Sequence, residues 1–376
     1  MKLSPDFSID SLVKIIINGL LVICPCISSA QSPFKDFSNL FTPPKNYVVN
    51  YVKTAPVIDG DIKDVAWNQA HWTEDFKDIE GNLKPIPLLK TKVKMLWSDS
   101  CLYIAAQIHD PQVWATITRH DDIIFRDNDF EVFINPNNTT HQYFEMEFNA
   151  LNTLFDLFLN KPYRNGGNAM FGWNADGLRS AVKIQGTSND ATDTDTGWTI
   201  EIAIPFKAIS LGNDVQTPNE GTLWRINFSR VEWDTLVSDG KYVKVKDAAG
   251  RNLPEHNWVW SPQGVVDMHY PERWGYLQFT KANATFNLPY SEKQRQYLWL
   301  VYYHEKLWYK NHQVYESVLK NFGIDNKVTI DGQINSLQLE ATGHQFMALI
   351  TNDKDKITWT INQEGLISRL TTTADE

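Results

Sequence analysis

Residues 143–149 read YFEMEFN, and residues 224–231 read WRINFSRV. In both stretches large apolar side chains alternate with polar ones, which is the period of a β-strand with one face on a core. Similar stretches recur between about residues 48 and 280, separated by Gly, Pro, Asn, Asp and Ser clusters that mark turns. The clearest predicted strands are Lys92–Trp97, Leu102–His109, Phe130–Ile134, Tyr143–Asn149, Trp198–Ile204 and Trp224–Val231. This spacing predicts an antiparallel β-sandwich.

The residues of these strands that face away from the predicted core are mostly acidic. They include Glu145, Glu147 and Glu201, with Arg225 as the main basic exception. Acidic residues on the outer face of a sandwich are usually solvated, so we expect an exposed, mostly acidic surface there.

Composition places the chain among globular proteins. Of its 376 residues, 42% are hydrophobic and 21% are charged, which is enough to bury a sizeable core. The formal net charge of −10 counts against a nucleic-acid partner or an anionic membrane, because both need a basic face.

The hydrophobic period changes after Pro289. Residues 291–294 read SEKQ, a capping-box pattern that predicts the start of a helix. The apolar face of that helix continues to Val318, and Gly323 is its predicted end. Five short strands are predicted after it, at residues 327–330, 337–340, 346–350, 357–361 and 366–370. The fold class predicted for the whole chain is therefore mainly β, an antiparallel β-sandwich at 48–281 followed by a small C-terminal α+β appendage at 285–376.

The N-terminal 30 residues have the pattern of a signal peptide. An apolar run from Ile15 to Ile23 is followed by Ser28-Ser29-Ala30, a small-residue cleavage site, and the run is too short to span a membrane. An anchor that is never cleaved is the alternative. Residues 31–47 are predicted to be a polar lead-in linker. We therefore expect export to the periplasm, cell surface or extracellular space, with no transmembrane span in the mature chain.

Four segments resemble, in order, the family 9 carbohydrate-binding modules and their larger family-9-like relatives. They are IDGDIKDVAW at residues 58–67, DNDFEVFINP at 127–136, GWTIEIAIP at 197–205 and WRINF at 224–228. The resemblance covers about residues 48–280. It implies a β-sandwich that binds sugars and that often accompanies glycoside hydrolases in secreted polysaccharide-degrading systems.

The resemblance also implies where a sugar would bind. In sugar-binding members two aromatic rings clamp a terminal sugar and a Glu of the central strand binds its hydroxyls. That Glu falls on Glu131, and the first ring falls on Phe125, where those members carry Trp. The second ring falls close to Met268, which has no flat face for stacking. An Arg and an Asn of those members fall near Glu145 and Glu147. Three other aromatic side chains are candidates for the second ring: Trp258, Trp260 and Tyr270.

Alternatives remain open for these residues. Phe125 is also typical of a core residue, and Glu131 of a surface ion pair. Carboxylates two apart on one strand, as at 127, 129 and 131 or at 145 and 147, lie ~7 Å apart on one face, a spacing compatible with an inverting glycoside hydrolase. Calcium is a candidate ligand, although no complete EF-hand loop is present. The candidate calcium ligands are Asp127 and Asp129, or the loop residues Asp190, Asp193 and Asp195.

We therefore expect a secreted protein that binds a sugar or glycan end without turning it over. A carbohydrate-active hydrolase using the acidic face is the first alternative. A non-catalytic scaffold that has lost the sugar site is the second.

Overall fold

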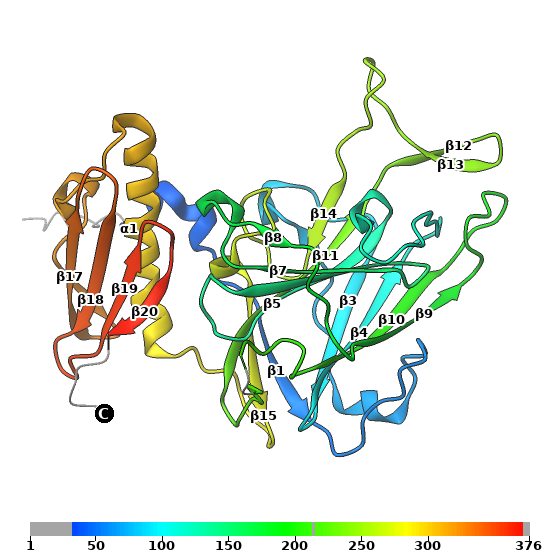
Figure 1. The fold of residues 1–376 in the computed structure, drawn as a ribbon, viewed down its shortest axis with the longest axis horizontal. Coiled ribbons are helices and arrows are strands. Elements are labelled where there is room, and N and C mark those ends of the chain that lie inside the picture. Colours follow the sequence, from blue (N-terminus) through cyan, green and yellow to red (C-terminus); the bar gives the residue numbers. More distant parts are fainter. Residues whose placement is uncertain (1–31, 213–214, 371–376) are drawn as a thin grey trace, which may run out of the picture.

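The computed structural model describes residues 32–212 and 215–370. Thirteen strands form one hydrogen-bonded sheet that folds into two facing layers, and a five-stranded sheet with helix α1 lies beside it (Figure 1). The mainly β fold with a small C-terminal α+β unit is confirmed. The predicted signal peptide lies outside the described residues. No helix within the two described ranges combines the length and the apolarity that crossing a membrane requires.

The strand order of the large sheet is β8-β7-β6-β5-β11-β15-β1-β3-β4-β10-β9, with β14 paired to β11 and β2. The strands of the first layer are β5 (Asp129–Asn135), β6 (Tyr143–Asn149), β7 (Leu154–Leu159), β8 (Ala169–Met170), β11 (Leu223–Glu232), β14 (His256–Val259) and β2 (Lys77–Asp78). The other strands are β15 (Gly275–Thr280), β1 (Asn46–Tyr51), β3 (Thr91–Trp97), β4 (Cys101–His109), β10 (Gly197–Pro205) and β9 (Arg179–Gln185). A separate hairpin consists of β12 (Thr235–Ser238) and β13 (Lys241–Lys244).

The two layers meet in one hydrophobic core, which the alternation of the strands predicts. One face of β5 and β6 contributes to it, and so do alternate residues of the facing strands β3, β4 and β10. The core members from these strands include Phe130, Val132, Phe144, Met146, Val93, Ile104 and Ile200. The opposite face of β5 and β6, which carries the acidic residues, is therefore left free to build a site.

One strand departs from the antiparallel pattern. Strand β1 runs parallel to both of its neighbours, β15 and β3, with Val48 opposite Gln278 and Asn50 opposite Leu96. Alternation within a strand does not encode the direction of its partners, so the sequence does not predict this pairing.

The segment IDG…W at residues 58–67 forms a turn that covers Glu201 and hydrogen-bonds to its carboxylate. Glu201 is fully buried, and its carboxylate accepts hydrogen bonds from Trp67 Nε1 at 2.6 Å and from the Gly60 amide at 2.8 Å. Gly60 has φ +85°, and a Cβ there would lie 2.8 Å from the amide nitrogen of Lys183, so only glycine fits. The expectation that Glu201 is solvated is wrong, because this turn covers it.

Helix α1 (Tyr290–His312) differs from its prediction at both ends. It is preceded by Pro289 and has no side-chain cap, so the SEKQ pattern does not act as a capping box. It ends at His312, because Gln313 adopts a left-handed conformation with φ 61°. The predicted continuation to Gly323 is wrong: that glycine instead ends the 3₁₀ helix η7 (Leu319–Phe322). The five strands that follow are β16 (Lys327–Ile330), β17 (Gln333–Ala341), β18 (Phe346–Asn352), β19 (Thr358–Asn362) and β20 (Ile367–Leu370).

The appendage is docked on the sandwich through buried polar contacts. Arg225 of β11, expected on an exposed face, instead pairs with Glu292 of α1 at 3.0 Å, and both side chains are buried. The lead-in before β1 is also part of the fold: it forms the 3₁₀ helix η1 (Lys35–Phe41), and its aromatic rings pack against Tyr297 and Tyr303 of α1. The remaining 3₁₀ helices are η2 (Val65–Gln69), η3 (Gly81–Leu83), η4 (Ile124–Arg126), η5 (Tyr163–Asn165) and η6 (Pro271–Arg273).

Candidate functional site

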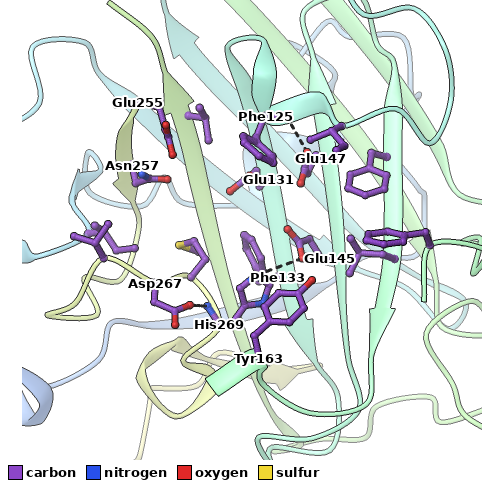
Figure 2. Close-up of a pocket in the computed structure, with 18 residues that line it drawn as sticks. Phe125, Glu131, Phe133, Glu145, Glu147, Tyr163, Glu255, Asn257, Asp267 and His269 are labelled. Atoms are coloured by element: carbon purple, nitrogen blue, oxygen red, sulfur yellow. Dashed lines mark hydrogen bonds and ion pairs between the residues drawn. The ribbon is translucent and has the colours of Figure 1, made fainter. Parts of the chain in front are cut away.

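A cavity of about 420 Å³ lies on the outer face of β5, β6 and β7, on the side opposite the sandwich core. Its floor is formed by these strands, and its walls come from the loop at 123–125, from the segments 163–171 and 255–257, and from the loop at 266–269. Figure 2 shows the lining side chains converging on this space from several elements. A concave site with an apolar lining and a few converging polar groups is typical of a small-ligand pocket.

Three glutamates of adjacent strands project into this cavity. Glu131 of β5 lies directly opposite Glu147 of β6 in the register, and Glu145 lies opposite Phe133, so all three share one face. The exposed fractions of Glu131, Glu145 and Glu147 are 5%, 5% and 3%. The expectation of a solvated acidic surface is wrong here, because the surrounding loops cover this face.

Burial dominates the electrostatics of these carboxyl groups. It raises the pKa of Glu131 to about 7 and holds the pKa values of Glu145 and Glu147 well above their ordinary range. The charge of Glu131 raises the pKa values of both Glu145 and Glu147 further. Burial and the charge of Glu131 also raise the pKa of the neighbouring Asp129 well above its usual value. Ionisation of all four carboxyl groups is therefore unfavourable unless a positive charge lies beside them.

His269 lies at the other end of the cavity, next to Glu145 (Figure 2). Its Nδ1 is 2.9 Å from the hydroxyl of Tyr143, and its Nε2 is 4.0 Å from a carboxylate oxygen of Glu145. Burial, with a contribution from Arg164, lowers the pKa of His269 to about 4. The imidazole is therefore neutral at physiological pH and supplies no positive charge to the cavity.

Phe125 lies at the edge of the cavity, in η4. Its backbone amide donates to Glu147 Oε2 at 2.9 Å, and its carbonyl accepts from Trp233 Nε1 at 2.9 Å. These two bonds fix the backbone, while the ring remains 39% exposed and lines the cavity. An interpretation of Phe125 as a core residue is therefore wrong.

Five of the eight residues that the sequence places at a sugar site line this cavity, and three do not. Phe125, Glu131, Glu145, Glu147 and Met268 are among the lining residues. Trp258 and Trp260 are buried in the sandwich core instead. Tyr270 lies under the guanidinium of Arg164, with its ring centroid 3.8 Å from that group. None of these three rings is therefore placed to serve as the second clamp.

The sequence did not identify several lining residues. Tyr163 and Phe171 come from the Gly-rich segment after β7, and Glu255 and Asn257 from the segment that leads into β14. Tyr163 is positioned through contacts of the two residues that follow it, one with the sandwich and one with the appendage. Arg164 pairs with the buried Glu272 at 2.8 Å, and Asn165 donates to the carbonyl of Glu364 at 2.6 Å. The only sequence signal for Tyr163 and Phe171 is a Gly-rich loop, which does not specify what it packs against.

The candidate calcium ligands fall into different environments. The carboxylate of Asp127 accepts hydrogen bonds from the amides of Thr116 and Ile117, at 2.8 and 2.9 Å, and that of Asp195 accepts from Val113 at 2.9 Å. These carboxylates are thus already used by the backbone. Asp190 and Asp193 are exposed and bind nearby threonine hydroxyls.

Two groups of three side chains, among the residues that the structure describes, have ligand atoms close enough to hold one ion. Asp129, Glu131 and Glu147 form a buried group whose oxygens lie within 4.8 Å of one another. His120, Asp121 and Asp156 form the second group, which is mostly exposed.

Comparisons with known proteins give one family and a few remote relatives. The model of the carbohydrate family 9 binding domain-like family matches residues 58–280. Endo-1,4-beta-xylanase A of Thermotoga neapolitana is 27% identical over 154 residues, which are 41% of this chain but only 12% of the xylanase. A family 9 carbohydrate-binding module from Caldicellulosiruptor kristjanssonii, solved with glucose and with cellotriose, is 16% identical in both structures, with TM-scores of 0.41. These structures align with 65% of this chain and with 100% and 98% of their own chains.

Proposed function

This chain belongs to the carbohydrate family 9 binding domain-like family, and from that premise we propose that its cavity binds a sugar or the end of a glycan without turning it over. The observation that carries the proposal is the combination of an exposed ring, Phe125, with the buried carboxyl groups of Glu131, Glu145 and Glu147 in one cavity. Sugar recognition needs both an apolar surface for the C–H face of the ring and acceptors for its hydroxyls.

Each part has a physical role in this proposal. Stacking the apolar face of a pyranose on Phe125 removes both surfaces from water and gains dispersion energy. A carboxylate such as Glu131 accepts hydroxyl hydrogen bonds that are charge-assisted, and burial strengthens them because the cavity has a lower dielectric constant than water. Met268 and Tyr163 complete the opposite wall as an adaptable apolar surface and a second ring.

A calorimetric titration tests this proposal. The purified chain is titrated with a panel that begins with glucose, cellotriose and xylo-oligosaccharides. We expect micromolar-to-millimolar binding by the wild type and a loss of at least tenfold in Phe125→Ala. The matched control is Trp258→Phe, which alters an aromatic residue of the core and should leave the affinity unchanged. Silence across the panel would instead favour a scaffold that has lost its sugar site.

A hydrolase is the second candidate function, and one observation favours it. Burial raises the pKa of Glu131 to about 7, which is where a general acid works best near neutral pH. Across the strands, oxygens of Glu131 and Glu147 lie within 4.8 Å of each other, closer than the ~7 Å expected for neighbours on one strand and nearer the spacing of retaining enzymes. Release of reducing sugar that Glu131→Gln abolishes would select this candidate over binding alone.

We propose further that the chain is exported and works beside polysaccharide-degrading enzymes. The support is the apolar run at residues 15–23 with its small-residue exit, together with the family membership. Secretion assays that compare the full chain with one lacking residues 2–30 test export. In this arrangement residues 48–281 form the sugar-binding unit and residues 285–376 the appendage docked on it.

A further inference from the structure

The cavity has an excess of acidic groups that nothing in its lining balances. Its lining includes five carboxyl groups and no Lys or Arg. The single histidine in the lining, His269, has its Nδ1 2.9 Å from the hydroxyl of Tyr143. Buried carboxylates without a positive partner are costly, so such a cluster either keeps its protons or binds a cation. The five lining residues that carry a carboxyl group are Glu131, Glu145, Glu147, Glu255 and Asp267.

The positions of the carboxylate oxygens favour a bound cation. Asp129, Glu131 and Glu147 each offer one oxygen, and these three oxygens all lie within 4.8 Å of one another. Calcium binds oxygens at about 2.3–2.6 Å, so any two of its ligands are at most roughly 4.6–5.2 Å apart. Three buried carboxylate oxygens that all lie within 4.8 Å of one another are therefore close enough to bind the same calcium ion.

Two buried carboxylate oxygens nearby accept no hydrogen bond. Asp129 is 1% exposed, and although its Oδ1 accepts from the Val231 amide at 3.1 Å, its Oδ2 is buried with no hydrogen bond. Glu145 Oε2 is likewise buried with no hydrogen bond. A buried acceptor without a hydrogen bond is unfavourable, and more so when it is charged, so each of these oxygens is expected to have a partner in the working protein.

We propose that Asp129, Glu131 and Glu147 hold a calcium ion at the floor of the cavity, with Glu145 beside it as a further acceptor. An all-oxygen, carboxylate-rich set suits a hard divalent cation rather than zinc or copper. The ion supplies the positive charge that the lining lacks and satisfies the orphaned oxygen of Asp129.

A cationic group on the ligand itself fits less well. Asp129 belongs to the triad but is not among the residues that line the cavity. An amino sugar entering from the cavity would reach Glu131 and Glu147 but leave Asp129 unpaired. A small ion reaches all three.

A calcium ion at this position would also take part in sugar recognition, a role that rests on the proposed function. Calcium takes six to eight oxygen ligands, more than three carboxylates supply when each binds through one oxygen. The remaining positions would be filled from the cavity, where vicinal hydroxyls of a sugar stacked on Phe125 could complete the coordination. The ion would thereby take over the role that a positively charged side chain has in other sugar sites.

Calcium binding by the chelator-treated chain tests the proposal. CaCl₂ is titrated calorimetrically into the wild type, Asp129→Asn, Glu131→Gln and the control Asp121→Asn, which removes a ligand of the exposed second group. Terbium luminescence, sensitised by Trp233 beside Phe125, reports on the site independently. Thermal unfolding of each variant in EDTA establishes that it is folded. The sugar panel is repeated with calcium and with EDTA.

We expect one calcium per chain, at least tenfold weaker binding in Asp129→Asn and Glu131→Gln, and no change in Asp121→Asn. No binding at millimolar calcium, or binding that both triad variants retain, would overturn the proposal. Sugar binding that persists in EDTA would overturn the bridging role yet leave the sugar site intact, whereas calcium binding without any sugar binding would refute only the proposed function.

Discussion

Replacing Glu131 by Gln should stabilise the calcium-free protein at neutral and alkaline pH. Glu131 is buried, and burial raises its pKa from an ordinary 4.5 to about 7. At pH 8 the folded protein must therefore ionise a carboxyl group that prefers its proton. At roughly 1.4 kcal/mol per pKa unit, this shift corresponds to about 3 kcal/mol of lost stability, which an uncharged amide of the same shape avoids.

The pH dependence has a defined sign. Below pH 4.5 Glu131 is protonated in both the folded and the unfolded chain and contributes nothing. Between pH 4.5 and about 7 only the folded chain keeps the proton, so the stability of the wild type falls as pH rises. Above about pH 7 the full penalty is present. The advantage of Glu131→Gln should therefore be near zero at pH 4 and about 3 kcal/mol at pH 8.

Denaturant unfolding in EDTA, followed at pH 4 and pH 8, measures this difference. The matched control is Glu201→Gln, because Glu201 is equally buried but accepts hydrogen bonds from Trp67 and Gly60. An amide there turns its NH₂ group toward one of those donors, so the control should lose stability at pH 8. Equal stability of Glu131→Gln and wild type at both pH values would refute the reasoning.

Three further predictions follow from the positions of single side chains. Phe125→Ala should lower sugar affinity at least tenfold in calorimetry and change the unfolding midpoint little, since the ring is 39% exposed. Trp258→Phe should lower the unfolding midpoint and leave sugar affinity unchanged, because Trp258 lies in the core. A loss of affinity in Trp258→Phe but not in Phe125→Ala would contradict both assignments. Arg164→Met leaves Glu272 as a buried, uncompensated charge and should lower the free energy of unfolding in denaturant by about 3–5 kcal/mol. It should also weaken sugar binding, because Arg164 positions the loop that carries Tyr163. An unchanged unfolding midpoint would contradict this role of Arg164. His269 resists protonation until about pH 4, so wild-type stability should decline between pH 6.5 and 4 through this residue, and His269→Gln should flatten that part of the profile.

Much of the fold follows from the period of the sequence. The alternation in residues 143–149 identifies strand β6 with both of its ends, and the alternate apolar residues do face the core. The pairing direction of β1 does not follow, because strand alternation is the same for parallel and antiparallel partners. The end of α1 does not follow from the sequence either, because Gln313 adopts a left-handed conformation more typical of Gly or Asn.

The site is less predictable than the fold. Alternation shows that Glu131, Glu145 and Glu147 face away from the core, but it cannot show that loops from distant parts of the chain cover them. Those loops convert a surface into a buried cavity and shift the pKa values of its carboxyl groups. Trp258 and Trp260 cannot be assigned from sequence for the same reason, since whether these rings point inward depends on the path of the chain around β14.

The appendage illustrates a further limit. Its secondary structure was largely predicted, but its contacts with the sandwich were not. The turn between β19 and β20 holds Asn165 through the Glu364 carbonyl, next to Tyr163 in the cavity wall. A segment that looks like a separate unit in the sequence therefore helps to shape the cavity wall.

A crystal structure of the chain with a sugar from the calorimetric panel, grown in calcium chloride, tests sugar binding in this cavity most directly. The expected result is a pyranose stacked on Phe125, with its hydroxyls directed to Glu131 and to an ion between Asp129 and Glu147. A sugar bound at another surface, with this cavity filled only by water, would contradict it.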